Sequence, residues 1–443
     1  MQFTAEWQLK SDGASWGLRI GAILAIVTAL STSPYSSPPM ANGFLRADGR
    51  KGIRNVVVVV YLVECAHHVA REIVFPVRDR GVHLLGFPGC FPNTYAHQML
   101  RQLCTHPNVG GVLLLSLGCE GFDRRALLED IRATGRPADV LVIQQSGGTR
   151  RTIESGRTWV NAALQQMQAI TRAPMHLDEL IVGTICGGSD ATSGITANPA
   201  VGRAFDRLVA AGARCIFEET GELIGCEEIM SLRAARPDLA PELVRSVDKA
   251  ARYYTALGHG SFAPGNAEGG LTTQEEKSMG AYSKSGNSLI AGILKPGDVP
   301  PASGLYLLDV VPDTYGEDGD VEVRWGFPNI SDIQEIGELI ACGAHLTLFT
   351  TGRGSVVGSA ISPVIKICAN PETYRRLSED MDINAGRVLE GEGTLEEVGQ
   401  EIFDRILQVA NGAQTASEAL GHAEFSLVYK SFEPLGPACL PAA

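Results

Sequence analysis

One stretch of the chain combines glycines, helix-capping hydroxyls and lysines: "EGGLTTQEEKSMGAYSKSG", residues 268–286. Thr272 and Thr273 are good N-cap residues, and a glutamate follows each by three positions, so a capped helix is predicted to begin here. A helix N-terminus presents free amides and partial positive charge. Lys277 and Lys284, seven residues apart, share a face of that helix. We therefore predict a small-anion pocket to which Thr272, Thr273 and Lys284 contribute. The alternative is a capped surface helix with solvated lysines.

Four cysteines end predicted strands: Cys65, Cys90, Cys119 and Cys186. Ligands of open parallel sheets bind beyond the carboxyl ends of the strands. The first three cysteines belong to consecutive strand–helix units, so the fold is expected to bring them to one edge. Thiolates that converge there could hold iron, as a single ion or as an iron–sulfur cluster. We predict all four as metal ligands; the alternative is that each is a small apolar residue that fills the core.

Two histidines, His67 and His68, follow Cys65 closely. Histidine can serve as a metal ligand or as a general base near neutral pH. Both residues are therefore candidates for the catalytic base, and a surface or capping role is the alternative.

Positive charge also gathers in two other glycine-containing stretches. "FLRADGRKGIRN", residues 44–55, carries arginines ahead of the first strand, and "FTTGRGSVVGSAISPVIK", residues 349–366, places hydroxyls and an arginine after an apolar run. Arginine suits carboxylate or sulfonate oxygens because its guanidinium binds them in bidentate fashion. The substrate-binding residues predicted here are Arg46, Arg50, Arg54, Thr351, Arg353 and Lys366. Neither "TGRG" nor "GGSD" (residues 187–190) fits a Walker loop, and no G-x-G-x-x-G opens a strand–helix unit, so nucleotide binding is not supported.

Alternating strands and helices must position these groups. "NVVVVVYLVEC", residues 55–65, is a β-branched run typical of a strand buried on both faces. Strand-like runs then alternate with amphipathic helices to about residue 254, and a second region with "GLYLLDVVP" and "HLTLFTTG" follows. The pattern predicts an α/β protein with a doubly wound parallel-sheet domain over residues 43–255. A second α/β domain over residues 256–443 would carry the GGLTT and TGRG loops.

Composition narrows the class of protein. The 443 residues carry a formal net charge of −13, which argues against a nucleic-acid surface. Ten cysteines without C-x-x-C spacing indicate a reducing, cytoplasmic compartment rather than a disulfide scaffold. The apolar run at residues 20–30 is too short to cross a bilayer, so no membrane association is expected. Residues 1–42 are predicted to be disordered or to precede a true translation start near Met40.

Several segments, in order along the chain, carry a family resemblance: "RADGRKGIRN", "HPNV…LGCE", "CGGSDATSGITANPAVG", "GGLTTQEEKS", "TTGRGSVVGSAISPVIK" and "DMDINAGRVLEGEGTLEEVGQEIF". Together they resemble the altronate and galactarate dehydratase family from about residue 43 to about residue 425. The resemblance implies a metal-dependent lyase, using iron, that acts on hydroxy acids. Many members carry a small domain ahead of this region that is absent here, which implies a separate small subunit and an oligomeric enzyme.

Within that family, "YLVECAHHVAREI", "GFPGCFPN", "LGHGSFAPGNAEGG" and "FEPLGPACLP" are similar to the sulfo-lyase branch. That resemblance implies elimination of sulfite from (2R)-3-sulfolactate to give pyruvate. The alternative is elimination of water from a sugar acid to give a 2-keto-3-deoxy acid. Both reactions begin with loss of the C2 proton, and the developing enediolate needs a metal or cationic clamp. Lys277 is the expected base, with His67 or His68 as the substitute.

Two further classes remain as alternatives. One is an anion-binding subunit without catalytic activity of its own. The other is a dehydrogenase-like α/β protein, which the missing dinucleotide fingerprint disfavours.

Overall fold

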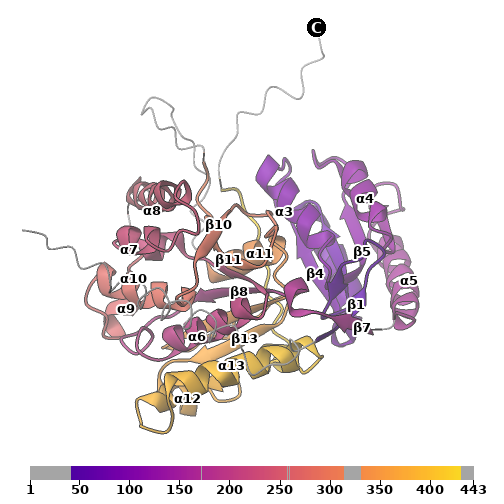
Figure 1. The fold of residues 1–443 in the computed structure, drawn as a ribbon. Helices are drawn as coiled ribbons and strands as arrows, with labels where there is room; N and C mark the ends of the chain where they lie inside the picture. Colours follow the sequence, from indigo (N-terminus) through magenta and orange to yellow (C-terminus); the bar gives the residue numbers. More distant parts are fainter. Residues whose placement is uncertain (1–40, 171, 257, 259, 314–330, 431–443) are drawn as a thin grey trace, which may run out of the picture. The chain divides into compact units, whose positions relative to one another are not determined.

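The computed structural model describes residues 41–170, 172–256, 258, 260–313 and 331–430 (Figure 1). The predictions for residues 1–40, including a translation start near Met40, lie outside this part of the chain. The predicted disordered extension also includes residues 41 and 42, which instead belong to strand β1 (Ala41–Leu45). Within it, no helix combines the length and the apolar character that a membrane span requires. The elements form two parallel sheets and one small antiparallel sheet, which confirms the predicted α/β class.

The antiparallel sheet joins the ends of the first region. Its order is β2-β1-β7, with β1 (Ala41–Leu45), β2 (Lys51–Gly52) and β7 (Arg172–Met175). Because β1 pairs with β7 over four residue pairs, the start of the described chain is tied to the segment that leads into the second parallel sheet.

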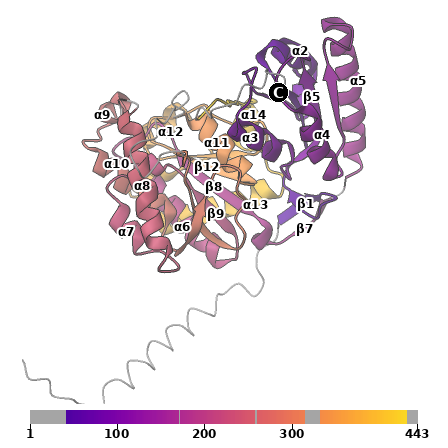
Figure 2. The same cartoon turned by 90° about the horizontal axis from the view of Figure 1, so that it is seen from above.

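The first parallel sheet has the strand order β4-β3-β5-β6. Its strands are β3 (Val56–Tyr61), β4 (Val82–Gly86), β5 (Val109–Ser116) and β6 (Ala138–Val142). Helices α2 (His67–Val74) and α5 (Thr149–Gln168) cover one face, and α3 (Thr94–Cys104) and α4 (Arg124–Ala133) cover the other (Figure 2). Val57 packs with the first pair and Val58 with the second, which explains why β3 is apolar at both alternating positions.

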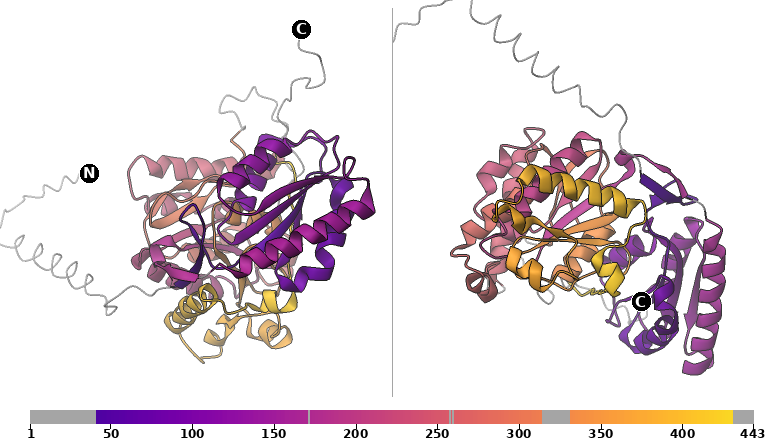
Figure 3. Two further views of the ribbon diagram at one scale, coloured as in Figure 1. Left: turned by 90° about the vertical axis from the view of Figure 1, so that its right-hand side faces the viewer. Right: turned by 90° about the horizontal axis from the view of Figure 1, so that it is seen from below.

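The second parallel sheet has seven strands in the order β10-β11-β9-β8-β12-β13-β14. They are β8 (Ile181–Cys186), β9 (Arg214–Phe217), β10 (Ile290–Leu294), β11 (Gly304–Leu308), β12 (Leu346–Thr351), β13 (Val364–Cys368) and β14 (Ile383–Asn384). Helices α6 (Ala197–Ala210) and α13 (Leu395–Ala410) pack on one face, and α11 (Asp332–Ala341) packs on the other. Figure 3 shows α13 running along its face of this sheet.

The remaining helices are short, apart from α8. They are α7 (Glu227–Ser231), α8 (Leu239–Ala256), α9 (Pro264–Glu268), α10 (Gln274–Tyr282), α12 (Pro371–Arg376) and α14 (Ala416–Leu420). In Figures 1 and 2, helices α7 to α10 form one group beside the seven-stranded sheet.

The strand order corrects the predicted domain boundary. A division at residue 255 cuts through the seven-stranded sheet, because β8 and β9 precede it whereas their neighbours β12 and β11 follow it. The two parallel sheets therefore divide before β8. Local patterns do not reveal this, because β8 and β9 look like the strands of the first sheet and their partners arrive through long crossovers.

The seven-stranded sheet also has a topological switch point. After β8 the chain builds β9, β11 and β10 on one side and then β12, β13 and β14 on the other. The crevice beyond the carboxyl end of β8 is therefore the position where open α/β sheets bind ligands.

Candidate active site

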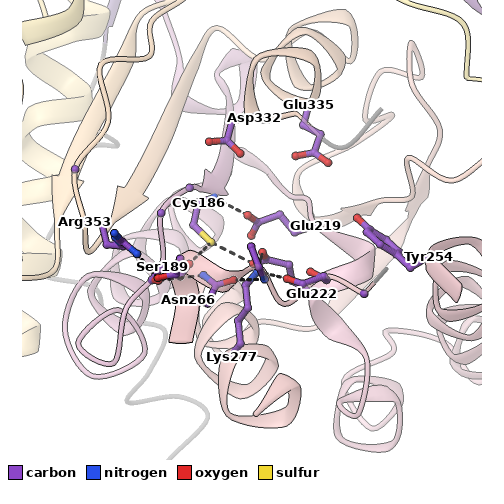
Figure 4. Close-up of a pocket in the computed structure, with 17 residues that line it drawn as sticks. Cys186, Ser189, Glu219, Glu222, Tyr254, Asn266, Lys277, Asp332, Glu335 and Arg353 are labelled. Atoms are coloured by element: carbon purple, nitrogen blue, oxygen red, sulfur yellow. Dashed lines mark hydrogen bonds and ion pairs between the residues drawn. The ribbon is translucent and has the colours of Figure 1, made fainter. Parts of the chain in front are cut away.

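A cavity of about 680 Å³ lies at the carboxyl end of β8 (Figure 4). Three adjacent strands deliver side chains to it from their carboxyl ends, and four helices close it from the other directions. The side chains that line it are Cys186 and Ser189 after β8, Glu219 and Glu222 after β9, Arg353 after β12, Tyr254 on α8, Asn266 on α9, Lys277 on α10, and Asp332 and Glu335 on α11.

Cys186, Glu219 and Glu222 bring one thiol and two carboxylates together. One ligand atom from each lies within 4.8 Å of the others, the only such set of three metal-ligating groups in the described part of the chain. The backbone amide of Cys186 donates to Glu219 Oε1 at 2.7 Å, and the thiol donates to Glu222 Oε2 at 3.2 Å. Glu219 has φ 88°, the left-handed region that side chains rarely adopt. Such strain persists where surrounding contacts require one orientation.

The two lysines of the 268–286 stretch face this cluster. Lys277 Nζ lies 2.5 Å from Glu222 Oε1 and also donates to the carbonyl of Ser261. Lys284 forms an ion pair with Glu219 Oε2. Both lysines are buried. Figure 4 shows Lys277 reaching from α10 toward Glu222.

The predicted helix start is confirmed, and it explains the two threonines. Thr273 Oγ1 accepts a hydrogen bond from the amide of Glu276, and the amide and hydroxyl of Thr272 donate to the Glu276 carboxylate. Thr272 and Thr273 are exposed and cap α10, and they do not line the cavity. They act by fixing where α10 begins and therefore where Lys277 points.

The cavity holds an excess of negative charge. Burial and the charge of Glu222 raise the pKa of Asp332 to about 6. Burial and the charge of Glu218 raise the pKa of Glu335 well above its usual range. Burial alone would lower the pKa of Lys277, but the charges of Glu222 and Cys186 outweigh it, so the net pKa is raised.

This electrostatic pattern fits a divalent cation. Burial and neighbouring carboxylates both disfavour the charged forms of Asp332 and Glu335, and a bound cation would offset both effects. A donor set of one thiol and several carboxylates suits a borderline first-row ion such as Fe²⁺, since carboxylates alone favour Mg²⁺ or Ca²⁺ and thiolates favour softer ions. Cys186, Glu219 and Glu222 could hold such an ion, with Asp332 and Glu335 within the same cavity.

Arg353 is the third predicted residue that lines the cavity, after Cys186 and Lys277. It donates to the carbonyl of Gly265, and its side chain, 40% exposed, lies 3.0 Å from Glu268 Oε2. Thr351 ends β12 just before it, and its hydroxyl accepts from the amide of Gly354. Thr351 therefore shapes the loop that carries Arg353.

Four of the predicted substrate-binding cations lie elsewhere and hold the fold together. Arg46 donates to the carbonyl of Pro107, and Arg50 pairs with Asp48. Arg54 pairs with Glu418 through two nitrogens and also donates to two carbonyls at the end of α13. Lys366 is fully buried in β13. A guanidinium fork that suits a carboxylate ligand suits backbone carbonyls equally well, so the sequence could not separate the two uses.

The predicted histidines and three of the cysteines also lie away from the cavity. Cys65, Cys90 and Cys119 follow strands of the four-stranded sheet, whereas Cys186 ends β8 of the other sheet. His67 stacks on Tyr61 and pairs with Glu64, and His68 contacts Arg71. The fold thus separates Cys186 from the other three cysteines, and Lys277 from both histidines.

Sequence reasoning missed the acidic residues of the site. Glu218, Glu219 and Glu222 follow the strand-like "RCIF" within "EETGE", so the strand-end argument applied to cysteine would have selected them too. Asp332 and Glu335 begin α11, and no local signal indicates that this helix start faces β8.

Comparisons with known proteins cover almost all of the described chain. The family model for the second domain of D-galactarate dehydratase/altronate hydrolase matches residues 43–168. The model for the C-terminal domain of D-galactarate/altronate dehydratase matches residues 177–432. These spans place the division between the domains near the one that the two parallel sheets show.

Three curated relatives are similar over most of the chain. The (2R)-sulfolactate sulfo-lyase subunit beta of Chromohalobacter salexigens is 34% identical over 87% of this chain and 96% of its own length. The altronate dehydratase of Bacillus subtilis is 31% identical over 86% of this chain and 76% of its own length. The galactarate dehydratase (L-threo-forming) of Escherichia coli is 32% identical, with 86% and 75% covered.

Proposed function

The chain belongs to the D-galactarate/altronate dehydratase family, and from that membership we propose that it eliminates sulfite from (2R)-3-sulfolactate. Its matched relatives are lyases, and so is this chain. The finer proposal has three parts: sulfolactate as substrate, a divalent iron ion in the cavity, and a separate small subunit as partner.

One observation carries the chemical assignment. Lys277 meets the Cys186, Glu219 and Glu222 cluster at the switch point of the sheet, so a basic nitrogen and a candidate cation site share one cavity. Eliminations of a 2-hydroxy acid need both, because the C2 proton is barely acidic and its removal places charge on the adjacent carboxylate.

The reaction balances as follows. Lys277 Nζ accepts the proton from C2, and the electron pair left behind forms the C2–C3 double bond. The C3–S bond breaks, and its electron pair leaves with sulfite. The resulting enol of pyruvate takes up a proton at C3 and loses the proton of its C2 hydroxyl to give pyruvate. Loss of water from a sugar acid follows the same course, with hydroxide leaving from C3 and a proton supplied to it.

A cation bound by Cys186, Glu219 and Glu222 would supply positive charge to stabilise the enediolate. Because the charge of Glu222 raises the pKa of Lys277, its amine would act as a base where that charge is compensated, as a cation held by Glu222 would do. Arg353 sits at the rim of the cavity and would bind the substrate's anionic end. Tyr254 and Asn266 close the walls.

One observation favours sulfolactate over a sugar acid. The chain matches 96% of the sulfo-lyase beta subunit's length but 75–76% of the two dehydratases described above, at slightly higher identity. The name of that relative, a subunit beta, is the reason to propose a partner subunit. The alternative remains a dehydratase of altronate or galactarate type.

A paired assay tests the proposal. The chain is produced with its small subunit, loaded with Fe²⁺ without oxygen, and offered (2R)-3-sulfolactate, altronate or galactarate. We expect sulfite and pyruvate in equal amounts from the first and little keto acid from the others. Keto-deoxy acid from a sugar acid without sulfite release would overturn sulfolactate and leave the lyase class intact. Turnover that survives complete removal of metal would contradict the proposal that the reaction needs a bound cation.

A further inference from the structure

Three cysteines stand apart from the others in exposure. Of the nine cysteines in the described part of the chain, Cys65, Cys90 and Cys119 are exposed and the other six are buried. Cysteine is among the residues most often buried in proteins. Three exposed thiols on the same small sheet therefore need an explanation other than packing.

The strand register places Cys65, Cys90 and Cys119 the same number of residues beyond one row of the sheet. Tyr61 of β3 pairs with Gly86 of β4 and with Leu115 of β5, so these residues form one row across the sheet. Each cysteine lies four residues beyond its member of that row: Cys65 after Tyr61, Cys90 after Gly86 and Cys119 after Leu115. Neighbouring parallel strands are about 4.8 Å apart, so the three loops begin side by side.

Backbone hydrogen bonds join these loops. The amide of Gly121 donates to the carbonyl of Cys90 at 2.8 Å, and the amide of Glu64 donates to the carbonyl of Pro88 at 3.3 Å. The loop after β4 is therefore attached both to the loop after β5 and to the loop after β3. The order β4-β3-β5-β6 also makes this edge the switch point of the smaller sheet, since the chain adds β4 on one side of β3 and β5 on the other.

A buried carboxylate in the same loop is incompletely paired. Glu120 follows Cys119 directly and is 8% exposed. Its Oε2 accepts from the amide of Gly118, but its Oε1 has no hydrogen-bond partner among the described residues. A buried oxygen without a partner is costly, so such a group points to a missing ligand.

We propose that Cys65, Cys90 and Cys119 bind an iron–sulfur cluster at this edge, with Glu120 Oε1 as the candidate fourth ligand. This site is separate from the cavity at β8 and does not depend on the reaction proposed there. Its cysteines lie on the four-stranded sheet, whereas the Cys186 cluster lies on the seven-stranded one.

The three thiols are not placed as ligands of a single tetrahedral ion. Two sulfurs bound to one tetrahedral ion at about 2.3 Å lie only ~3.8 Å apart. The described residues contain one set of three ligand atoms within 4.8 Å of one another, and it is not this one. In a cluster each thiolate binds a different iron, so the cysteine sulfurs stand farther apart than around one ion.

Reconstitution of the full-length chain tests the proposal. The protein is purified without oxygen, incubated with Fe²⁺ and sulfide, and desalted. We expect roughly four acid-labile sulfide per chain, about four iron besides any ion held by the Cys186 cluster, a broad absorbance band near ~400 nm and an electron paramagnetic resonance signal after dithionite. Cys65→Ser, Cys90→Ser and Cys119→Ser should each lose most of the sulfide. Because these side chains are exposed, thermal unfolding of the metal-free variants should stay close to that of the metal-free wild type.

Cys186→Ser is the matched control, because it removes a strand-end cysteine from the other sheet and should leave the sulfide content unchanged. Sulfide lost from this variant, or retained by the triple cysteine variant, would overturn the assignment. So would zinc or a single iron without sulfide, or a disulfide between two of the three cysteines in protein kept without oxygen. A Glu120→Gln protein with an unchanged resonance signal would exclude Glu120 from the ligand set.

Discussion

The thiol of Cys186 lies 3.2 Å from Glu222 Oε2, although 36 residues separate them in the chain. Cys186 ends β8, and Glu222 follows β9, the adjacent strand of the same parallel sheet. Lys277 contacts the other oxygen of Glu222 at 2.5 Å. A single carboxylate thus joins the candidate metal ligand to the candidate base, so replacing either neighbour changes the environment of the other.

Cys186→Ala should weaken Fe²⁺ binding by about 100-fold or more, because even partners one step behind a metal ligand typically contribute 10- to 100-fold. Anaerobic titration followed by iron analysis measures this. Cys215→Ala is the matched control, since Cys215 lies buried on the neighbouring strand β9 away from the cavity. Equal iron affinity of wild type and Cys186→Ala would remove Cys186 from the ligand set.

Lys277→Arg separates charge from proton transfer. Arginine keeps the positive charge beside Glu222 but does not give up its proton in proteins, so it cannot serve as a base. We expect kcat to fall by about 10²- to 10⁴-fold, the usual contribution of a general base, with a much smaller change in KM. Exchange of the C2 proton of the substrate with solvent should stop as well. Normal turnover of the variant would mean that another group accepts the proton.

Asp332→Asn should stabilise the metal-free protein at neutral pH. The pKa of Asp332 is raised from 3.8 to about 6, so the folded state binds more protons than the unfolded state between these values. Stability therefore falls as the pH rises through that window, by up to ~3 kcal/mol for a shift of about two pH units. Asparagine removes this loss.

Urea unfolding of the metal-free proteins at two pH values tests the direction of the predicted stability difference between the variant and the wild type. The variant should be the more stable one at pH ~7.5, and the difference should shrink toward pH ~3, below the unfolded-state pKa of 3.8, where Asp332 is largely protonated in both states. A variant that is less stable at pH ~7.5 would contradict the proposed excess of negative charge. Added Fe²⁺ should stabilise the wild type more than the variant, because it compensates the charge that asparagine lacks.

Arg54→Ala should lower the stability of the fold without changing KM, whereas Arg353→Ala should raise KM without lowering stability. The Arg54 side chain is 14% exposed and forms a two-nitrogen pair with Glu418, whose side chain is 23% exposed. Its loss leaves a partly buried carboxylate and two backbone carbonyls without their donor, and should cost ~1–3 kcal/mol of unfolding free energy. Its KM should stay near the wild-type value. Arg353, 40% exposed, should change stability little and raise KM clearly.

Denaturant unfolding and steady-state kinetics on both arginine variants provide the comparison. If Arg54→Ala raises KM without loss of stability, Arg54 belongs to the substrate site after all. If Arg353→Ala leaves KM unchanged, the rim of the cavity does not bind the anionic end of the substrate.

The sequence by itself determined the class of fold, the capped start of α10 and the family. These follow from local patterns: alternation of strands and helices, a threonine three residues ahead of a glutamate, and short motifs with fixed order. It also identified Cys186, Lys277 and Arg353, since residues at strand ends and helix starts are the ones that a parallel α/β sheet presents to ligands.

Only the tertiary structure decided which strand ends share a site. Cys65 and Cys186 both end strands in the sequence, yet the strands lie in different sheets because hydrogen-bonded pairing, not chain order, selects neighbours. The same pairing brings Glu219 and Glu222 beside Cys186, and the packing of α11 places Asp332 in the cavity. Arg46 and Arg54 are cations that the sequence suggested for substrate binding. In the folded chain Arg46 donates to a backbone carbonyl and Arg54 pairs with a carboxylate, so both stabilise the fold instead.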